Sequence, residues 1–256
     1  SNYLMASRLK PNTISTYMRM LRSIYNRGVD MHQAPYVHGL FRDVFTGVDT
    51  RQKKAIPIGE LHMLLNKDPQ SEKLRRTQAI ANLLFQFCGM PFSDLAHLEK
   101  SNLERGLLKY NRTKTGTPMS IEVLESAQNA IGGLYNKSDA RSSGYPDYLF
   151  RILSGAYKRN EEGAYREYQS ALRRFNNELK SLSRKLRLHS PVTSYTLRHS
   201  WATTAKYRGV PIEMISESLG HKSIKTTQIY LKGFELEERT KVNKLNYSYV
   251  CNFKML

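Results

Sequence analysis

Two glycines divide the stretch from Ser194 to Tyr230 into three segments, and this punctuation constrains the fold more than any other feature of the chain. Gly209 and Gly220 stand where the C-terminal caps of helices are expected, and Thr193 or Ser194 stands where an N-terminal cap is expected. The stretch therefore predicts three consecutive short helices.

Three side chains on these predicted helices are suited to phosphoryl transfer. Arg198 can clamp a phosphate through two hydrogen bonds, the imidazole of His221 is a donor at neutral pH, and the hydroxyl of Tyr230 can attack phosphorus. Together they indicate phosphoryl transfer through a covalent ester, with neither a metal nor a cofactor.

This pattern resembles the tyrosine recombinase (phage integrase) family, in particular integrases of conjugative transposons and prophages. The family signature is H-x-x-R-H, then L-G-H, then a nucleophilic Tyr nine residues after that His. Arg198-His199, the His221 of L-G-H and Tyr230 fit it, whereas Tyr195 occupies the place of the first His. The resemblance covers nearly the whole chain, from about residue 4 to about residue 244.

Pro91 is the most serious departure from the family pattern. The segment from Gly89 reads G-M-P-F-S-D, where the family has G-x-R-x-x-(E/D). Asp94 keeps the acidic position, but Pro91 replaces the first of two phosphate-clamping arginines. Because proline has no side-chain donor, either another residue supplies the charge or the enzyme is impaired.

A predicted hairpin offers a substitute for the missing arginine. The segment Leu107–Lys114 alternates like a strand, and a turn and a returning strand follow it. The resemblance maps the family's catalytic Lys, the general acid for the departing 5′ oxygen, to Lys114. Arg112 lies two residues earlier, on the same face of a strand, so we hypothesise that it supplies the guanidinium missing at Pro91. A solvated Arg, or one that contacts DNA without a catalytic role, is the alternative.

Two further residues of the first short helix belong to the predicted site. Tyr195 shares a helical face with Arg198, and its phenol can donate to the scissile phosphate as the family's His does. A buried Tyr without a catalytic role is the alternative. His199 is expected to support the site structurally.

The resemblance implies two domains. Residues 1–52 are expected to form part of a helical core-binding (SAM-like) domain, in which a helix from Ile14 is capped at Gly28. Residues 53–256 are expected to form the catalytic domain, which is mainly α with a small antiparallel β-sheet (α+β). The chain lacks an initiator Met, which suggests that an expression remnant precedes a truncated protein.

Further elements are predicted inside the catalytic domain. Apolar residues at helical spacing predict a long amphipathic helix over residues 164–186 with a basic outer surface, which either touches DNA or is merely solvated. Residues 235–245 predict a last helix. The apolar segment 247–256 then packs either on a neighbouring protomer or on its own domain.

The charge balance points to a polyanionic partner. The 256 residues include 40 Lys and Arg against 22 Asp and Glu, a net charge of +18, which favours nucleic acid over a membrane surface. No apolar run reaches the roughly 20 residues that span a bilayer, so a soluble, cytoplasmic and nucleoid-associated protein is expected. Cys88 and Cys251 are too few for a disulfide framework or a Cys-based zinc site.

By resemblance, Tyr230 attacks the scissile phosphate of double-stranded DNA and forms a 3′-phosphotyrosyl link, and strands are exchanged through a Holliday junction. A homo-tetramer on two duplexes is expected, with a monomer in solution. Two rivals stay open. A type IB topoisomerase shares this chemistry, and a DNA-binding descendant without activity is motivated by Pro91 and Tyr195.

Overall fold

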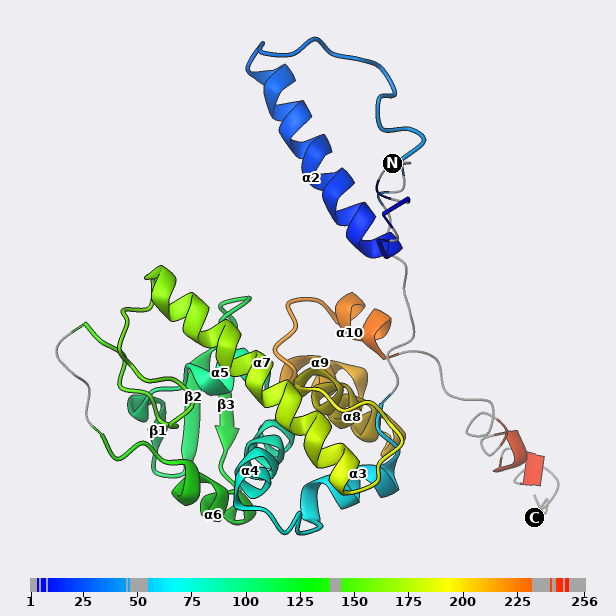
Figure 1. Cartoon of the computed structure of the whole chain (residues 1–256). Coiled ribbons are helices and arrows are strands. Elements are labelled where there is room, and N and C mark those ends of the chain that lie inside the picture. Colours follow the sequence, from blue (N-terminus) through cyan, green and yellow to red (C-terminus); the bar gives the residue numbers. More distant parts are fainter. Residues whose placement is uncertain are drawn as a thin grey trace. The chain divides into compact units, whose positions relative to one another are not determined.

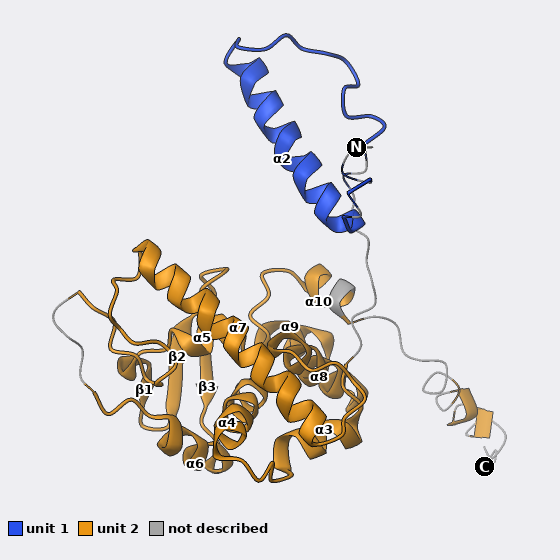
Figure 2. Cartoon of the chain, in the orientation of Figure 1, with its two compact units in different colours: residues 1–52 blue, residues 53–256 orange. Residues whose placement is uncertain are grey.

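The computed structural model describes residues 4, 6–7, 9–44, 46, 55–138, 144–231, 240, 243–245 and 247–248, without the side chains of residues 229 and 230 (Figure 1). The chain divides into two compact units, residues 1–52 and residues 53–256 (Figure 2). Each is described by itself. The assignment of the first unit to a core-binding domain stays a prediction.

The first unit is built on helix α2 (Pro11–Asp30), which buries Ile14, Ser15 and Met18. The predicted end at Gly28 was wrong, because the helix continues for two residues beyond it. The chain then reverses at His32, whose φ is 56°, and the carbonyl of Gly28 accepts from the amides of residues 33 and 34. Gly28 thus lies inside the helix, near the place where the chain folds back.

Helix α4 lies at the centre of the second unit. It packs against α3, α6, α7 and α8, and its Leu83 and Leu84 are fully buried in the main hydrophobic core. Each such side chain contributes about 1.5–3 kcal/mol of burial free energy. The helices before the last three are α3 (Ile58–Asn66), α4 (Glu72–Gln86), α5 (Phe92–Ala96), the 3-10 helix η1 (Lys100–Asn102), α6 (Glu125–Leu134) and α7 (Glu162–Lys185).

A three-stranded antiparallel sheet completes the fold, in the order β1 (Leu103–Glu104), β2 (Leu107–Asn111) and β3 (Pro118–Glu122). Leu108 pairs with Ile121, and both are buried against the main core. The mainly helical architecture with a small antiparallel sheet confirms the predicted fold class.

Strand β2 is shorter than predicted. It ends at Asn111, which pairs with Pro118. The turn is closed by a hydrogen bond of 2.8 Å, which the Arg112 amide donates to the Thr117 carbonyl. Gly116 shapes this turn with a φ of 68°, a backbone conformation that favours glycine. Arg112 and Lys114 therefore belong to the turn and not to the strand.

The three predicted short helices are confirmed as α8 (Ser194–Tyr207), α9 (Ile212–Ser218) and α10 (Ile224–Tyr230). The Thr193 hydroxyl caps α8 by accepting from the Thr196 amide at 3.2 Å. Gly209 and Gly220 follow α8 and α9 with φ of 76° and 64°.

A second small core holds these helices together, formed by Ala202, Ile215, Leu219 and Leu231. Most of the predicted helix 235–245 and of the segment 247–256 lies outside the described residues. Within the described part of the chain, no helix is both long enough and apolar enough to cross a membrane.

Candidate active site

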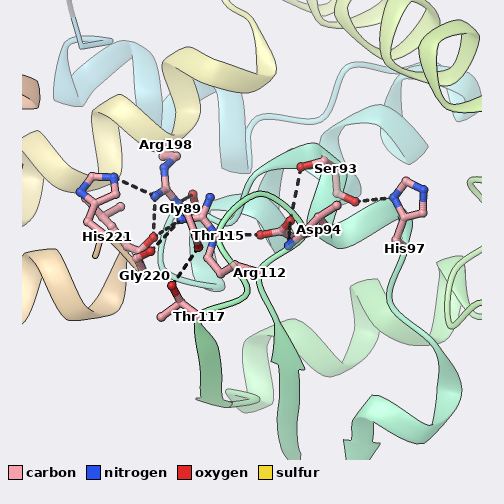
Figure 3. A network of polar contacts seen from close by, with 12 residues as sticks. Gly89, Ser93, Asp94, His97, Arg112, Thr115, Thr117, Arg198, Gly220 and His221 are labelled. Atoms are coloured by element: carbon pink, nitrogen blue, oxygen red, sulfur yellow. Dashed lines mark hydrogen bonds and ion pairs between the residues drawn. The ribbon is translucent and has the colours of Figure 1, made fainter. Parts of the chain in front are cut away.

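Arg112, Arg198 and His221 meet at the turn between α9 and α10 (Figure 3). Nη2 of Arg198 donates to the carbonyl oxygen of Leu219 at 2.6 Å, and Nη1 of Arg112 donates to the same oxygen. Arg198 Nη2 also lies 3.3 Å from Nε2 of His221. Two arginines from distant parts of the chain thus place their guanidinium groups at one carbonyl.

Arg198 is anchored to the turn after α4. Its Nη1 donates to the Gly89 carbonyl at 2.9 Å, and only 6% of the residue is exposed. Gly89 has a φ of 64°, and a Cβ there would lie 3.1 Å from the Cα of Arg198 and 3.2 Å from the Cβ of Trp201. The close approach of this turn to α8 therefore depends on glycine.

Arg112 is anchored to α5. Its Nε donates to Oδ2 of Asp94 at 3.0 Å, while Oδ1 of Asp94 accepts from the Thr113 amide at 3.1 Å and from the Ser93 hydroxyl at 3.3 Å. The Asp94 side chain is completely buried. This carboxylate therefore fixes both the Arg112 side chain and the backbone of the hairpin turn.

Gly220 leaves the space through which Arg112 reaches the site. A Cβ at this residue would lie 2.5 Å from Cδ of Arg112 and 2.7 Å from Sδ of Met119. The glycine between Leu219 and His221 is thus needed for the path of the Arg112 side chain as well as for its own left-handed backbone.

The site holds an excess of buried positive charge. Among the described residues, the buried carboxylate, guanidinium and ammonium groups are those of Asp94, Arg112 and Arg198, which leaves one positive charge in excess. Burial, together with the charges of Arg198, Arg112 and Lys114, lowers the pKa of His221 to about 4. His221 is therefore neutral at pH 7, and the site is prepared for an anion.

Lys114 lies on the exposed surface of the hairpin turn, close enough for its charge to lower the pKa of His221. The argument that Lys114 and Arg112 share a strand face was wrong, because both residues follow the end of β2 at Asn111. The turn, and not strand alternation, directs Arg112 inward and leaves Lys114 exposed.

Pro91 is the N-cap of α5, and its carbonyl accepts from the amides of Asp94 and Leu95. It therefore starts the helix that carries Asp94, although it offers no side-chain donor. Tyr195 is 43% exposed on the first turn of α8, with its ring 6.0 Å from the ring of the buried His199. The catalytic role of Tyr195 and the supporting role of His199 stay predictions.

Tyr230 is the last residue of α10, and its side chain lies outside the described part of the structure. The nucleophile assignment is therefore a prediction that rests on the motif. Thr227 and Leu231, which stand before and after Tyr230 in the chain, are both buried.

Sequence reasoning missed the Leu219 carbonyl, the packing roles of Gly89 and Gly220, and Thr227. The Thr227 hydroxyl lies 2.8 Å from Nδ1 of His221. The only signal in the sequence for a role of Thr227 was its position, one helical turn before Tyr230. Among the described residues, no cluster of three His, Cys, Asp or Glu side chains could hold a metal ion.

Comparison with known proteins places this chain in a family. The sequence profile of the phage integrase family matches residues 58–236. A probable integrase/recombinase protein of Methanocaldococcus jannaschii is 28% identical over 204 residues, which are 77% of this chain and 58% of that protein. Tyrosine recombinase XerD of Halalkalibacterium halodurans is 30% identical over 190 residues, which are 70% of this chain and 57% of that protein.

The chain thus spans less than three fifths of the length of these two relatives. Among solved structures, the Tn1549 transposon integrase in complex with a circular intermediate DNA matches with a TM-score of 0.62 and 15% identity. That match covers 94% of this chain and 82% of the other chain. At this identity the structural likeness establishes the fold alone.

Proposed function

The chain belongs to the phage integrase family, and from that premise we propose that it is a site-specific recombinase that cuts and rejoins DNA through a 3′-phosphotyrosyl intermediate. The observation that carries the proposal is the meeting of Arg112 and Arg198 at one carbonyl oxygen, beside a neutral His221 and with positive charge in excess. Such a site suits the phosphate of a DNA backbone.

In the proposed reaction, Tyr230 Oη attacks the scissile phosphorus, and the P–O5′ bond breaks as the Tyr–O–P bond forms. The phenol gives its proton to solvent water, and Lys114 donates a proton to the departing 5′ oxygen. Arg198, Arg112 and His221 stabilise the nonbridging oxygens, with Tyr195 at the family's His position. Attack by a 5′ hydroxyl reverses the steps, so no high-energy cofactor is consumed.

Arg112 is proposed to take the role of the arginine that Pro91 replaces. The geometry supports this substitution because Arg112 is 7% exposed and shares an acceptor with Arg198. The phosphate would replace the Leu219 carbonyl as the common partner of the two guanidinium groups. Asp94 would orient Arg112 through its Nε, leaving the terminal nitrogens for the DNA.

We propose further that the reaction serves a mobile genetic element, as an integrase, and that four protomers act on two duplexes. The likeness to the transposon integrase solved with circular intermediate DNA supports the first part. The tetramer follows from the symmetric exchange of strands between two duplexes, since each of the four strands needs one nucleophile.

Covalent capture tests the activity. The protein is incubated with a nicked suicide duplex built from the ends of its own element, and a denaturation-resistant protein–DNA band is expected. The band should be absent with Tyr230→Phe. Tight DNA binding by the parent protein without any band would instead support a DNA-binding descendant.

A second experiment separates the recombinase from a type IB topoisomerase. A recombinase exchanges strands between two duplexes that carry the same site, so recombinant products should appear only when both sites are present. Relaxation of a single supercoiled plasmid without recombinant products would support the topoisomerase.

A further inference from the structure

Thr227 is the one threonine of α10 that the structure buries. Its exposed fraction is 0%, whereas the adjacent Thr226 is exposed. Its hydroxyl oxygen lies 2.8 Å from Nδ1 of His221, six residues earlier in the chain. A buried hydroxyl is expected to be hydrogen-bonded, and here its partner is a residue of the candidate site.

A second contact of His221 indicates which ring nitrogen carries the proton. The nitrogens of Arg198 can only donate, so Nε2 of His221, 3.3 Å from Arg198 Nη2, must act as the acceptor. A neutral imidazole then carries its proton on Nδ1, and this N–H donates to the Thr227 hydroxyl.

Thr227 also connects His221 with the helix that ends at Tyr230. The Thr227 carbonyl accepts from the Leu231 amide at 2.7 Å, and Leu231 packs into the small core with Leu219. The end of α10 is therefore held from both sides of Tyr230, by Thr227 before it and by Leu231 after it.

We propose that Thr227 is a positioning residue, which fixes the proton of His221 on Nδ1 and directs the Nε2 lone pair to the place where the two arginines meet. This role rests on the proposed function only in so far as His221 takes part in strand cleavage. A proton added to Nε2 on DNA binding leaves the Nδ1–H in place, so the bond to the Thr227 hydroxyl survives and Nε2–H can then donate to a nonbridging oxygen of the phosphate.

The first test reads the tautomer directly and needs no activity. In protein labelled with 15N-histidine, the His221 signals are assigned by comparison with His221→Asn. We expect the proton of the parent protein on Nδ1, and a mixture of both tautomers in Thr227→Val, which keeps the side-chain shape but loses the hydroxyl. A parent protein with the His221 proton on Nε2 would overturn the proposal, whatever the outcome of the cleavage assays.

The second test uses the rate of covalent capture at saturating DNA. Thr227→Val is expected to slow capture by about tenfold or more, by analogy with the loss of a residue that orients a metal-bound histidine. Thr227→Ser, which keeps the hydroxyl, should restore the rate to within about threefold. Thr226→Val is the matched control and should match the parent.

Equal capture rates for Thr227→Val and Thr226→Val would contradict the positioning role. If Thr227→Val does not fold, the tautomer of the parent protein and the capture rate of Thr227→Ser still test the positioning role. Loss of activity in the serine variant would also contradict that role. If the parent protein shows the expected tautomer but forms no covalent band, the proposed function fails while the Thr227–His221 assignment stands.

Discussion

Arg112 connects the hairpin turn with two other elements of the candidate site. Its Nε is held by Asp94 on α5, and its Nη1 reaches the turn between α9 and α10. In the family pattern the corresponding charge comes from position 91, at the start of α5. The acidic residue is kept while its guanidinium partner comes from the hairpin instead.

We expect Arg112→Ala to lower the rate of covalent capture by about 10²–10³, as for removal of a preorganised transition-state donor, and Arg198→Ala to behave alike. The capture rate of Arg112→Lys should lie between those of Arg112→Ala and the parent, because lysine keeps the charge but loses the forked geometry of the guanidinium group. Arg105→Ala, an exposed Arg in the turn before β2, is the control.

Thermal unfolding accompanies these assays, because breaking the buried pair with Asp94 costs about 3–5 kcal/mol. Capture by Arg112→Ala at the parent rate, with Arg198→Ala inactive, would refute the substitution of Arg112 for Pro91.

His221 ties stability to pH. The cations Arg198, Arg112 and Lys114 face it, and with burial they lower its pKa to about 4, whereas an unfolded His titrates near 6.5. Between these values the unfolded chain binds a proton that the folded chain does not, so the free energy of unfolding rises with pH. The contribution is complete above about pH 6.5 and is lost towards pH 4.

Urea unfolding at pH 7.5 and pH 5 checks this prediction. The parent protein should lose more stability between these values than His221→Asn, and the difference isolates His221 from the other histidines. An equal loss in both proteins would show that His221 has no depressed pKa in the folded state.

At the scale of elements, α7 could be predicted from its apolar period, and the three helices from Ser194 to Tyr230 could be predicted from the glycines between them. Local sequence signals did not predict the ends of elements that are determined by tertiary contacts. Gly28 resembles a cap but lies inside α2, and β2 ends at Asn111 although the alternating pattern continues.

The candidate site shows the same division. Arg198 and His221 could be found from their motif. Arg112 was proposed as the substitute for the missing arginine from a wrong strand register; the structure places it beside Arg198, and its substitute role stays a prediction. The shared Leu219 carbonyl could not be predicted, because it depends on two close approaches, of the turn after α4 to α8 at Gly89 and of the hairpin to the α9–α10 turn at Gly220. Sequence spacing carries no information about such close approaches.

Helix α10 decides which protomer supplies the nucleophile. Thr227 and Leu231 hold its end against α8 and α9 of the same chain, so we expect Tyr230 to cut the DNA bound by its own arginines. Mixing Tyr230→Phe with Arg198→Ala should then give no capture above that of either protein alone. Restored capture in the mixture would show that Tyr230 acts on a site of a neighbouring protomer.

At the scale of the whole molecule, the net charge of +18 must be divided between DNA contacts and solvated surface. The exposed basic residues of the C-terminal half of α7 include Lys180, Arg184 and Lys185. Figure 1 shows this end of α7 beside α3, at the opposite end of the unit from α10 and the β2–β3 turn. The candidate site lies at that other end, so these residues are expected to be solvated.

Salt dependence tests this division. For a protein with 6–10 phosphate contacts, the binding constant falls by about 10³–10⁵ between 50 and 200 mM salt, with a log–log slope that counts the contacts. Lys114→Gln should reduce the slope by about one, because it removes one contact beside the site. The triple variant Lys180→Gln, Arg184→Gln, Lys185→Gln should keep the parent slope, although it loses three charges. A slope reduced by about three would instead place the DNA backbone along α7, and the path of the duplex would then cover both ends of the unit.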